Sequence, residues 1–170
     1  GIDVLPPDVN KSEKHFSTEN GAIRYSLLGI KHVGEAVVDE IIAARERKMP
    51  TDLFEFMDGV DVHNMNKQAL EALTKAGAFE CFPGNKAEKL GSIMDLLASA
   101  QQDAKNSLDG QMSLFGMDTG FKLDRKLNPA TEFSKKDLMQ MEKEMLGIYL
   151  TAHPLDDVAE EIKTIIDCDT

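Results

Sequence analysis

One stretch near the N-terminus decides the fold, Ser26-Leu27-Leu28-Gly29-Ile30-Lys31-His32-Val33-Gly34-Glu35-Ala36-Val37. It predicts a short helix, a tight turn that ends in Gly34, and a second helix directly after this glycine. The second helix is expected over residues 35–47, because apolar residues recur there at spacings of four and three. These residues are Val37, Ile41 and Ala44, and they form the buried face.

The succession of helix, glycine-bearing turn and helix is typical of a helix-hairpin-helix motif. Such a turn aims backbone N–H groups outward, and the helix dipole adds partial positive charge, so the position favours a phosphate group. Gly34 lets the backbone approach the phosphate, and Ala36 lets the two helices pack closely. His32 stands where the usual motif has a glycine, and its ring can donate to a phosphate. The candidate phosphate-binding residues are Lys31, His32, Val33 and Gly34. An ordinary helical turn stabilised by glycine is the alternative.

A second, weaker copy of the same plan runs from Asn66 to Ala87. Asn66 can cap a helix that ends at Gly77, and another helix starts after Pro83 and Gly84. The apolar faces of the two helices are Ala69, Leu70, Leu73 and Ala76, then Ala87, Leu90, Met94 and Leu97. The candidate DNA-binding residues are Gly77, Gly84, Asn85 and Lys86. A pair of hairpins could touch both strands of one duplex, which positions a protein without reading sequence.

The rest of the chain divides around these hairpins. Residues 1–26 predict a short β element with a hairpin turn at Asn20-Gly21, because this dipeptide tolerates positive φ. Residues 27–100 form the bundle with both hairpins. Residues 101–133 have the composition of a flexible linker. Residues 134–170 predict helices, the first capped by Ser134 with Asp137 and the last starting at Asp156. The expected fold is therefore mainly α, a tandem helix-hairpin-helix bundle with a small N-terminal β element, a flexible linker and C-terminal helices.

One apolar island interrupts the linker. It consists of Gln111, Met112, Ser113, Leu114 and Phe115, between two glycines. An exposed glutamine followed by two large apolar side chains is suited to docking into a pocket of a partner. The alternative is a segment that folds back onto the helical bundle.

Composition limits the possible classes of function. The chain has 170 residues, a formal net charge of −11 and only two cysteines, which are far apart. No apolar run is long enough to cross a bilayer, and the cysteine and histidine spacings suit neither zinc nor a disulfide framework. Residues 101–170 carry eight basic and fourteen acidic side chains, more than half of the excess acid. The whole-chain charge is thus a poor guide to the hairpins, although these too lack a strongly basic patch.

Together, these residues resemble the bacterial DNA polymerase III alpha subunits, the C-family replicative polymerases, over nearly the whole chain. Residues 4–10 are similar to the end of the fingers region, and residues 29–34 and 66–86 to the tandem helix-hairpin-helix domain. Residues 111–115 are similar to the internal motif that binds the beta sliding clamp. Residues 142–150 are similar to the helical lead-in to the OB-fold domain.

The resemblance implies a non-catalytic segment that binds duplex DNA non-specifically and tethers the polymerase to the clamp. The palm carboxylates that hold Mg ions in this family lie outside such a segment, so no cofactor and no polymerase activity are expected here. The implied partners are double-stranded DNA, the beta sliding clamp and the remaining domains of the alpha subunit. The implied location is the bacterial cytoplasm, without a membrane partner and with a monomer as the default. The aspartates Asp52, Asp58 and Asp61 are then loop and cap residues.

Two other classes of function are open to the sequence. One is an enzyme built on the same motif, such as a base-excision glycosylase, with Asp52 as the carboxylate; few aromatics and no evident apolar base pocket argue against it. The other is a protein-interaction scaffold whose hairpins do not touch DNA, which the acidic charge favours. Phosphate contacts make affinity fall steeply with salt, so salt dependence separates this class from a DNA-binding segment.

Overall fold

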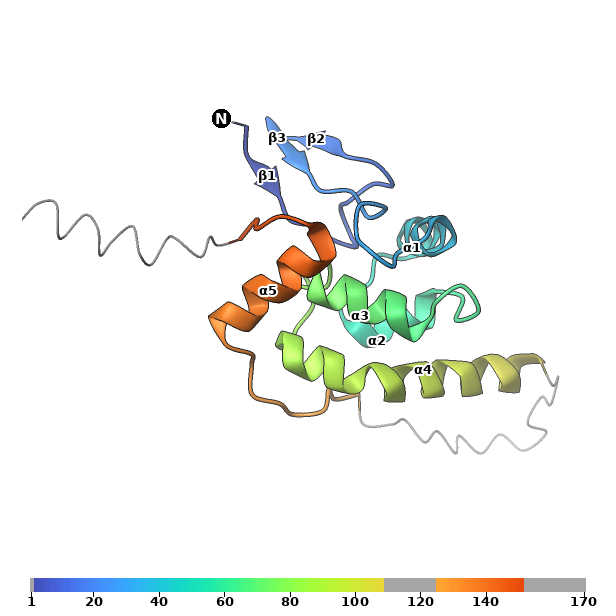
Figure 1. Ribbon diagram of the computed structural model, residues 1–170. Helices are drawn as coiled ribbons and strands as arrows, with labels where there is room; N and C mark the ends of the chain where they lie inside the picture. The colour runs from blue at the N-terminus through green and yellow to red at the C-terminus, as the bar shows by residue number, and fades with distance from the viewer. Residues whose placement is uncertain (1, 109–124, 152–170) are drawn as a thin grey trace, which may run out of the picture.

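The computed structural model describes residues 2–108 and 125–151, a mainly helical bundle with a small sheet on one side (Figure 1). The strands are β1 (Val4–Leu5), β2 (Ser17–Glu19) and β3 (Ala22–Arg24). The helices are α1 (Glu35–Arg47), α2 (Leu53–Gly59), α3 (Lys67–Lys75), α4 (Lys86–Leu108) and α5 (Lys135–Leu146). The predicted fold class is confirmed. The expected last helix from Asp156 and the island at residues 111–115 lie outside the described residues.

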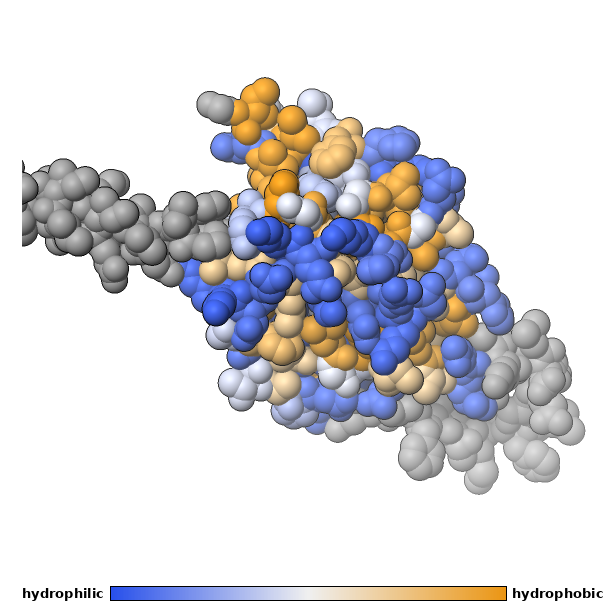
Figure 2. Space-filling model, in the orientation of Figure 1, coloured by the Kyte–Doolittle hydropathy of each residue, from blue (hydrophilic) through white to orange (hydrophobic). Residues whose placement is uncertain are grey.

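The N-terminal strands form one three-stranded sheet in the order β1-β3-β2. β2 and β3 are antiparallel, with Glu19 opposite Ala22, and β1 pairs with β3 in parallel. Between β2 and β3, Asn20 and Gly21 have φ values of 51° and 85°, as the predicted hairpin turn requires. Figure 2 shows apolar surface over β1, where Ile2 is the most exposed of the large hydrophobic residues.

The hydrophobic core lies among α1, α2, α3 and the start of α4. α3 packs between α4 and α5, as Figure 1 shows. Three phenylalanines from α2 and the α3–α4 connection meet there, with Phe56 edge-on to Phe79 at 5.0 Å between ring centroids and Phe82 stacked on Phe79. Buried faces of the helices match the predicted sets at Val37, Ile41, Ala44, Ala69, Leu70, Leu73 and Ala76.

Several local predictions are wrong in detail. The short helix before Gly34 is absent, and two consecutive turns replace it, closed by the amides of Ile30 and Val33. Ala36 is exposed and takes no part in helix packing, and Met94 lies on the outer face of α4. α4 also continues to Leu108, beyond residue 101 where the linker was expected to start, because the polar residues there suit an exposed helix.

Residues 125–134 run back along α4 without regular secondary structure, and we call them the strap. Asn128 holds the strap to α4, since its amide donates to Ser92 Oγ at 2.7 Å and its Nδ2 donates to the Gly91 carbonyl at 3.0 Å. The guanidinium of Arg125 pairs with Asp58. Ser134 caps α5 as predicted, accepting from the Asp137 amide, and Gly147 ends that helix with φ at 80°. Among the helices in the described ranges, none is long and apolar enough to cross a bilayer.

Candidate nucleic-acid interface

The first hairpin, residues 26–37, presents the bare start of α1. Gly34 is the N-cap of α1, and no side chain caps the helix there. Glu35 and Ala36 are exposed residues, and their amides have no acceptor among the described residues. A helix start with unused N–H groups and the positive end of its dipole attracts an anion. The start of α1 at Gly34 therefore has free donors for a phosphate, as the prediction requires.

Gly34 itself is not required by the fold. Its φ of −87° and ψ of 169° are open to any residue, and a Cβ at this position would meet nothing within 4 Å. Gly29 differs, because a Cβ there would lie 2.8 Å from Ser26 Oγ and 2.9 Å from the Tyr25 ring. The space in front of Gly34 is thus free for a ligand atom to approach the backbone.

The predicted side chains of the first hairpin divide into three kinds. Lys31 is exposed, and its ammonium has no partner among the described residues. His32 takes the left-handed conformation expected of the glycine it replaces, with φ at 66°, and its Nδ1 lies 3.1 Å from Gln68 Nε2 on α3. Val33 is buried in the core, so only its backbone belongs to the turn.

Acidic side chains near the turn are already engaged. Lys14 pairs with Asp39 at 3.0 Å and with Glu35 at 3.7 Å. The hydrogen bond to Asp39 is the main cause that raises the pKa of Lys14 above its ordinary value. Lys14 offsets one of these two negative charges, and Lys31 is a separate cation that can face an incoming phosphate.

The end of α5 supports the turn of the first hairpin. The Lys31 amide donates to the Met145 carbonyl at 3.0 Å, and the Tyr25 hydroxyl donates to the Leu146 carbonyl at 2.9 Å. Burial raises the pKa of Tyr25, which keeps the hydroxyl a donor. The carbonyls of the last two residues of α5 therefore hold the backbone of the turn that precedes the predicted phosphate position.

The second hairpin, residues 66–87, is closed by the strap. Glu132 accepts the Lys86 amide at 2.8 Å on one carboxylate oxygen and the Ala87 amide at 3.1 Å on the other. Burial tends to raise the pKa of Glu132, but the bonds from the amides of Lys86, Phe133 and Ala87 lower it overall. The N–H groups that were predicted to face a phosphate thus already hold a carboxylate.

The predicted residues of the second hairpin are covered rather than free. Gly84 has φ at 90°, and a Cβ there would clash with Leu127 of the strap. The Asn85 side chain donates to the Ala130 carbonyl at 2.9 Å. Lys86, predicted as a DNA-binding residue beside the helix start, has a buried side chain whose Nζ donates to the Lys75 carbonyl at 3.3 Å.

The turn between α3 and α4 uses its polar groups internally. Gly77 ends α3 as predicted, with φ at 84° and its amide bound to the Thr74 carbonyl. Lys89 is almost fully buried and donates to the Phe79 carbonyl at 2.9 Å, and burial lowers its pKa. These contacts stabilise the hairpin and leave Gly77 as a helix end.

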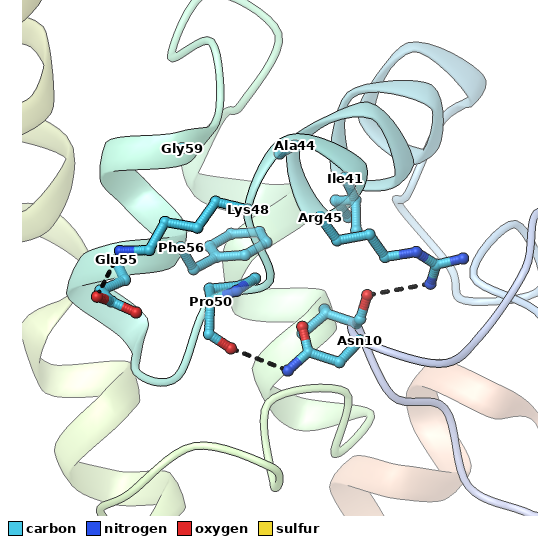
Figure 3. A pocket seen from close by; sticks show the side chains of 10 residues that line it. Asn10, Ile41, Ala44, Arg45, Lys48, Pro50, Glu55, Phe56 and Gly59 are labelled. Atoms are coloured by element: carbon cyan, nitrogen blue, oxygen red, sulfur yellow. Dashed lines mark hydrogen bonds and ion pairs between the residues drawn. The ribbon is translucent and has the colours of Figure 1, made fainter.

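Features of a base-excision site are not found near Asp52. Asp52 caps α2 by accepting the Glu55 amide at 2.7 Å, and Asp61 accepts the His63 amide, so both are cap and loop residues as predicted. The cavity between α1 and α2 has a volume of about 10 Å³ and is lined by Asn10, Arg45 and Pro50 among others (Figure 3). This is the size of one water molecule and is far too small for a base.

Two contributors escaped the sequence analysis. Glu132 and Tyr25 act through partners 46 and 121 residues away along the chain, and no local pattern marks such contacts. The predicted docking island, residues 111–115, lies outside the part of the chain that the structure describes.

Comparisons with known proteins agree with the hairpin geometry. A family model described as a helix-hairpin-helix motif matches residues 1–89. DNA polymerase III subunit alpha of Bacillus subtilis is 42% identical over 162 residues, which are 95% of this chain. The corresponding subunit of Caulobacter vibrioides is 38% identical over 93% of the chain, and that of Vibrio cholerae is 34% identical over 99%. The chain spans 14–15% of the length of these relatives, and the resemblance predicted from the motifs is confirmed.

Proposed function

Because this chain belongs to the helix-hairpin-helix family, we propose that its first hairpin holds duplex DNA by the phosphate backbone, as a segment of a replicative DNA polymerase. The observation that carries the proposal is the start of α1. The helix has no side-chain cap at Gly34, and the amides of Glu35 and Ala36 have no acceptor among the described residues. The exposed Lys31 lies in the turn just before this helix start. Such contacts hold a duplex in register and read no base sequence.

The binding is weak in isolation. Each cation that neutralises a phosphate contributes a slope of about −0.9 to the dependence of log affinity on log salt, and the first hairpin offers few. Weak, sequence-independent contact suits a segment that must let the duplex move past it. As the resemblance implies, we place catalysis in regions of a longer polymerase outside this segment; the chain spans about one seventh of the length of its relatives.

Charge reversal at Lys31 tests the proposal. We expect Lys31→Glu to weaken binding of a labelled duplex and to reduce the magnitude of the salt slope by about one. The matched control is Lys11→Glu, which makes the same charge change at an exposed side chain with no ion pair among the described residues. Its neighbour Asn10 bonds to the Pro50 carbonyl, beyond the other end of α1. Equal affinities of the two variants at low salt would reject the first hairpin as the site.

The second part of the proposal is a tether to the beta sliding clamp. It rests on the sequence of the island Gln111 to Phe115 and on the resemblance stated for it. A tether makes rebinding intramolecular at high effective concentration, so weak DNA contacts suffice. We expect Leu114→Ala with Phe115→Ala to abolish binding to purified clamp while the circular dichroism spectrum stays unchanged. Undiminished clamp affinity would reject the tether.

A scaffold without DNA contact is the second candidate. The observation in its favour is the closed second hairpin, where Glu132 occupies the amides that a phosphate would need. The net charge of −11 points the same way. A titration at low salt separates the two, because a scaffold shows no duplex binding at any ionic strength.

A further inference from the structure

Near its C-terminal end the strap carries the carboxylate of Glu132, which lies at the start of α4, where a phosphate was predicted to bind. Glu132 comes from a segment 45 residues beyond Ala87, yet both of its carboxylate oxygens accept amides from the first turn of α4. One oxygen also accepts the amide of Phe133. A bidentate anion on the first amides of a helix is the arrangement that a bound phosphate adopts. The second hairpin therefore carries its own anion.

The two hairpins differ in one respect that matters for DNA. At the start of α1 the amides are open to solvent, while at the start of α4 the strap covers them. Leu127 fills the space in front of Gly84, so the close approach that this glycine would permit is taken by an apolar side chain. The closure is thus both electrostatic, through Glu132, and steric, through Leu127.

We propose that Glu132 is an internal stand-in for a DNA phosphate, and that the strap must release it before the second hairpin can hold duplex. The inference rests on the proposed function, since it concerns the regulation of the same pair of hairpins. The strap then sets how many phosphates the segment contacts: with Glu132 seated only the first hairpin binds, and with Glu132 released both do.

The charges around the start of α4 make the exchange feasible. Lys86 pairs with Glu80 at 3.5 Å, and Lys89 is buried below the turn. Glu88 is engaged by the Asn85 amide at 2.8 Å. The carboxylate of Glu132 contacts the first turn of α4 but belongs to the strap and not to α4. Its departure therefore makes the start of α4 less negative and leaves the hydrogen bonds within α4 intact.

The residues that attach the strap to the helices differ from the residue that covers the amides at the start of α4. Asn128 binds Ser92, Gly91 and Asp95 near the middle of the described part of α4. Arg125 pairs with Asp58 on α2. These contacts do not involve the amides of Lys86 and Ala87, so Glu132 can leave while the strap stays attached further along. Leu127 lies between the two anchors and stays in front of Gly84 until they release as well. Substitutions at Glu132 and at Asn128 therefore probe different parts of the device.

The experiment titrates labelled duplex with the full 170-residue chain at low and moderate salt. We expect Glu132→Ala to raise the affinity about three- to tenfold at low salt and to steepen the salt slope by about one. Glu144→Ala removes the same charge at an exposed site on α5 and should leave both values unchanged. Asn128→Ala should have a smaller effect than Glu132→Ala, because the carboxylate stays available.

Amide hydrogen exchange gives a second readout that loss of stability alone does not reproduce. In Glu132→Ala the amides of Lys86 and Ala87 should exchange faster than in the wild type, and duplex should slow them again. Duplex binding to the wild type should speed exchange at Phe133 as Glu132 leaves. Protection by duplex confined to the first hairpin in both proteins would overturn the inference.

The failures of the two proposals have different signatures. If Lys31→Glu weakens binding while Glu132→Ala, Glu144→Ala and the wild type bind alike, the proposed function stands and the role of Glu132 is overturned. If Glu132→Ala binds tightly and Lys31→Glu has no effect, the first hairpin is not the site and the inference about Glu132 stands. If no protein binds duplex at low salt, both are overturned.

Discussion

At the scale of the residue, Gly34 is not required by the fold, and the proposed phosphate contact gives a reason for a glycine at this position. Its backbone conformation is ordinary, no neighbour crowds it, and a serine or aspartate would cap α1 better. Gly84 is the opposite case, since its positive φ and its contact with Leu127 both need glycine. The first glycine leaves room for a ligand, and the second leaves room for the strap.

Gly34→Asp separates stability from binding. An aspartate at this position caps α1 and meets the helix dipole, so we expect the free energy of unfolding to rise by a few tenths to about 1 kcal/mol. The same carboxylate occupies the amides and repels phosphate, so duplex affinity should fall at least tenfold at low salt. Urea unfolding and duplex titration check the two halves.

Met49→Asp is the control for Gly34→Asp. It adds the same charge at an exposed site just beyond the C-terminal end of α1. Its duplex affinity should stay within about twofold of the wild type, because the added charge is far from the amides. A Gly34→Asp protein that binds duplex as well as Met49→Asp would contradict the assignment of the site.

At the scale of the element, two segments distant in sequence determine the state of the hairpins. The end of α5 supports the first hairpin through the carbonyls of Met145 and Leu146. The strap closes the second hairpin through Glu132 and Leu127. Since the strap leads directly into α5, one continuous stretch of chain touches both hairpins and can couple them.

Gly84 of the second hairpin and Gly91 of α4 should respond in opposite ways to substitution by alanine, as measured by the free energy of unfolding. Gly84→Ala should lower the free energy of unfolding by more than about 1 kcal/mol, because it strains a positive φ and pushes Leu127 away. Gly91→Ala should raise it by about 0.5–1 kcal/mol, since Gly91 lies within α4 and its added Cβ would make only an ordinary contact with Asn128. Urea denaturation measures both, and a stabilised Gly84→Ala would contradict the packing of the strap.

The sequence predicts what depends on neighbouring residues. The caps at Asn66 and Ser134 follow from side chains that bond to amides three residues along the chain. The turn at Asn20-Gly21 and the end of α3 at Gly77 follow from residues that tolerate a positive φ. The strap could not be predicted, because the bonds of Glu132 reach across 45 and 46 residues with no periodic signal. The missing helix before Gly34 has a tertiary cause as well, since the Lys31 amide is bound to α5.

At the scale of the whole molecule, the chain is acidic, while the proposed site at the start of α1 combines a helix N-terminus with the cation Lys31. The net charge of −11 repels DNA over long distances, and salt screens this repulsion as well as the attraction at Lys31. Duplex binding by the isolated chain should therefore be weak. Under the proposed function, other contacts of a longer polymerase would bring the duplex close, and the first hairpin would only have to hold it.

The acidic surface also predicts how stability depends on pH. Hydrogen bonds from Lys48 and Thr51 lower the pKa of Glu55 from its ordinary value of 4.5 to about 2. Folding therefore favours the charged form, and this stabilisation is present above pH 4.5 and is lost as the pH falls towards 2. Wild type should unfold at higher urea than Glu55→Gln at pH 6, and the difference should vanish near pH 2. A difference that grows on acidification would contradict the assignment.

The measurement that tests the central claim most directly is an NMR titration of the ¹⁵N-labelled chain with a short duplex at low salt. The account predicts that the amides of Gly34, Glu35 and Ala36 shift first and most, and that these shifts disappear as salt rises. It also predicts that Lys86 and Ala87 stay unchanged until Phe133 moves. Shifts that leave residues 31–36 unaffected would contradict the claim that the first hairpin holds DNA.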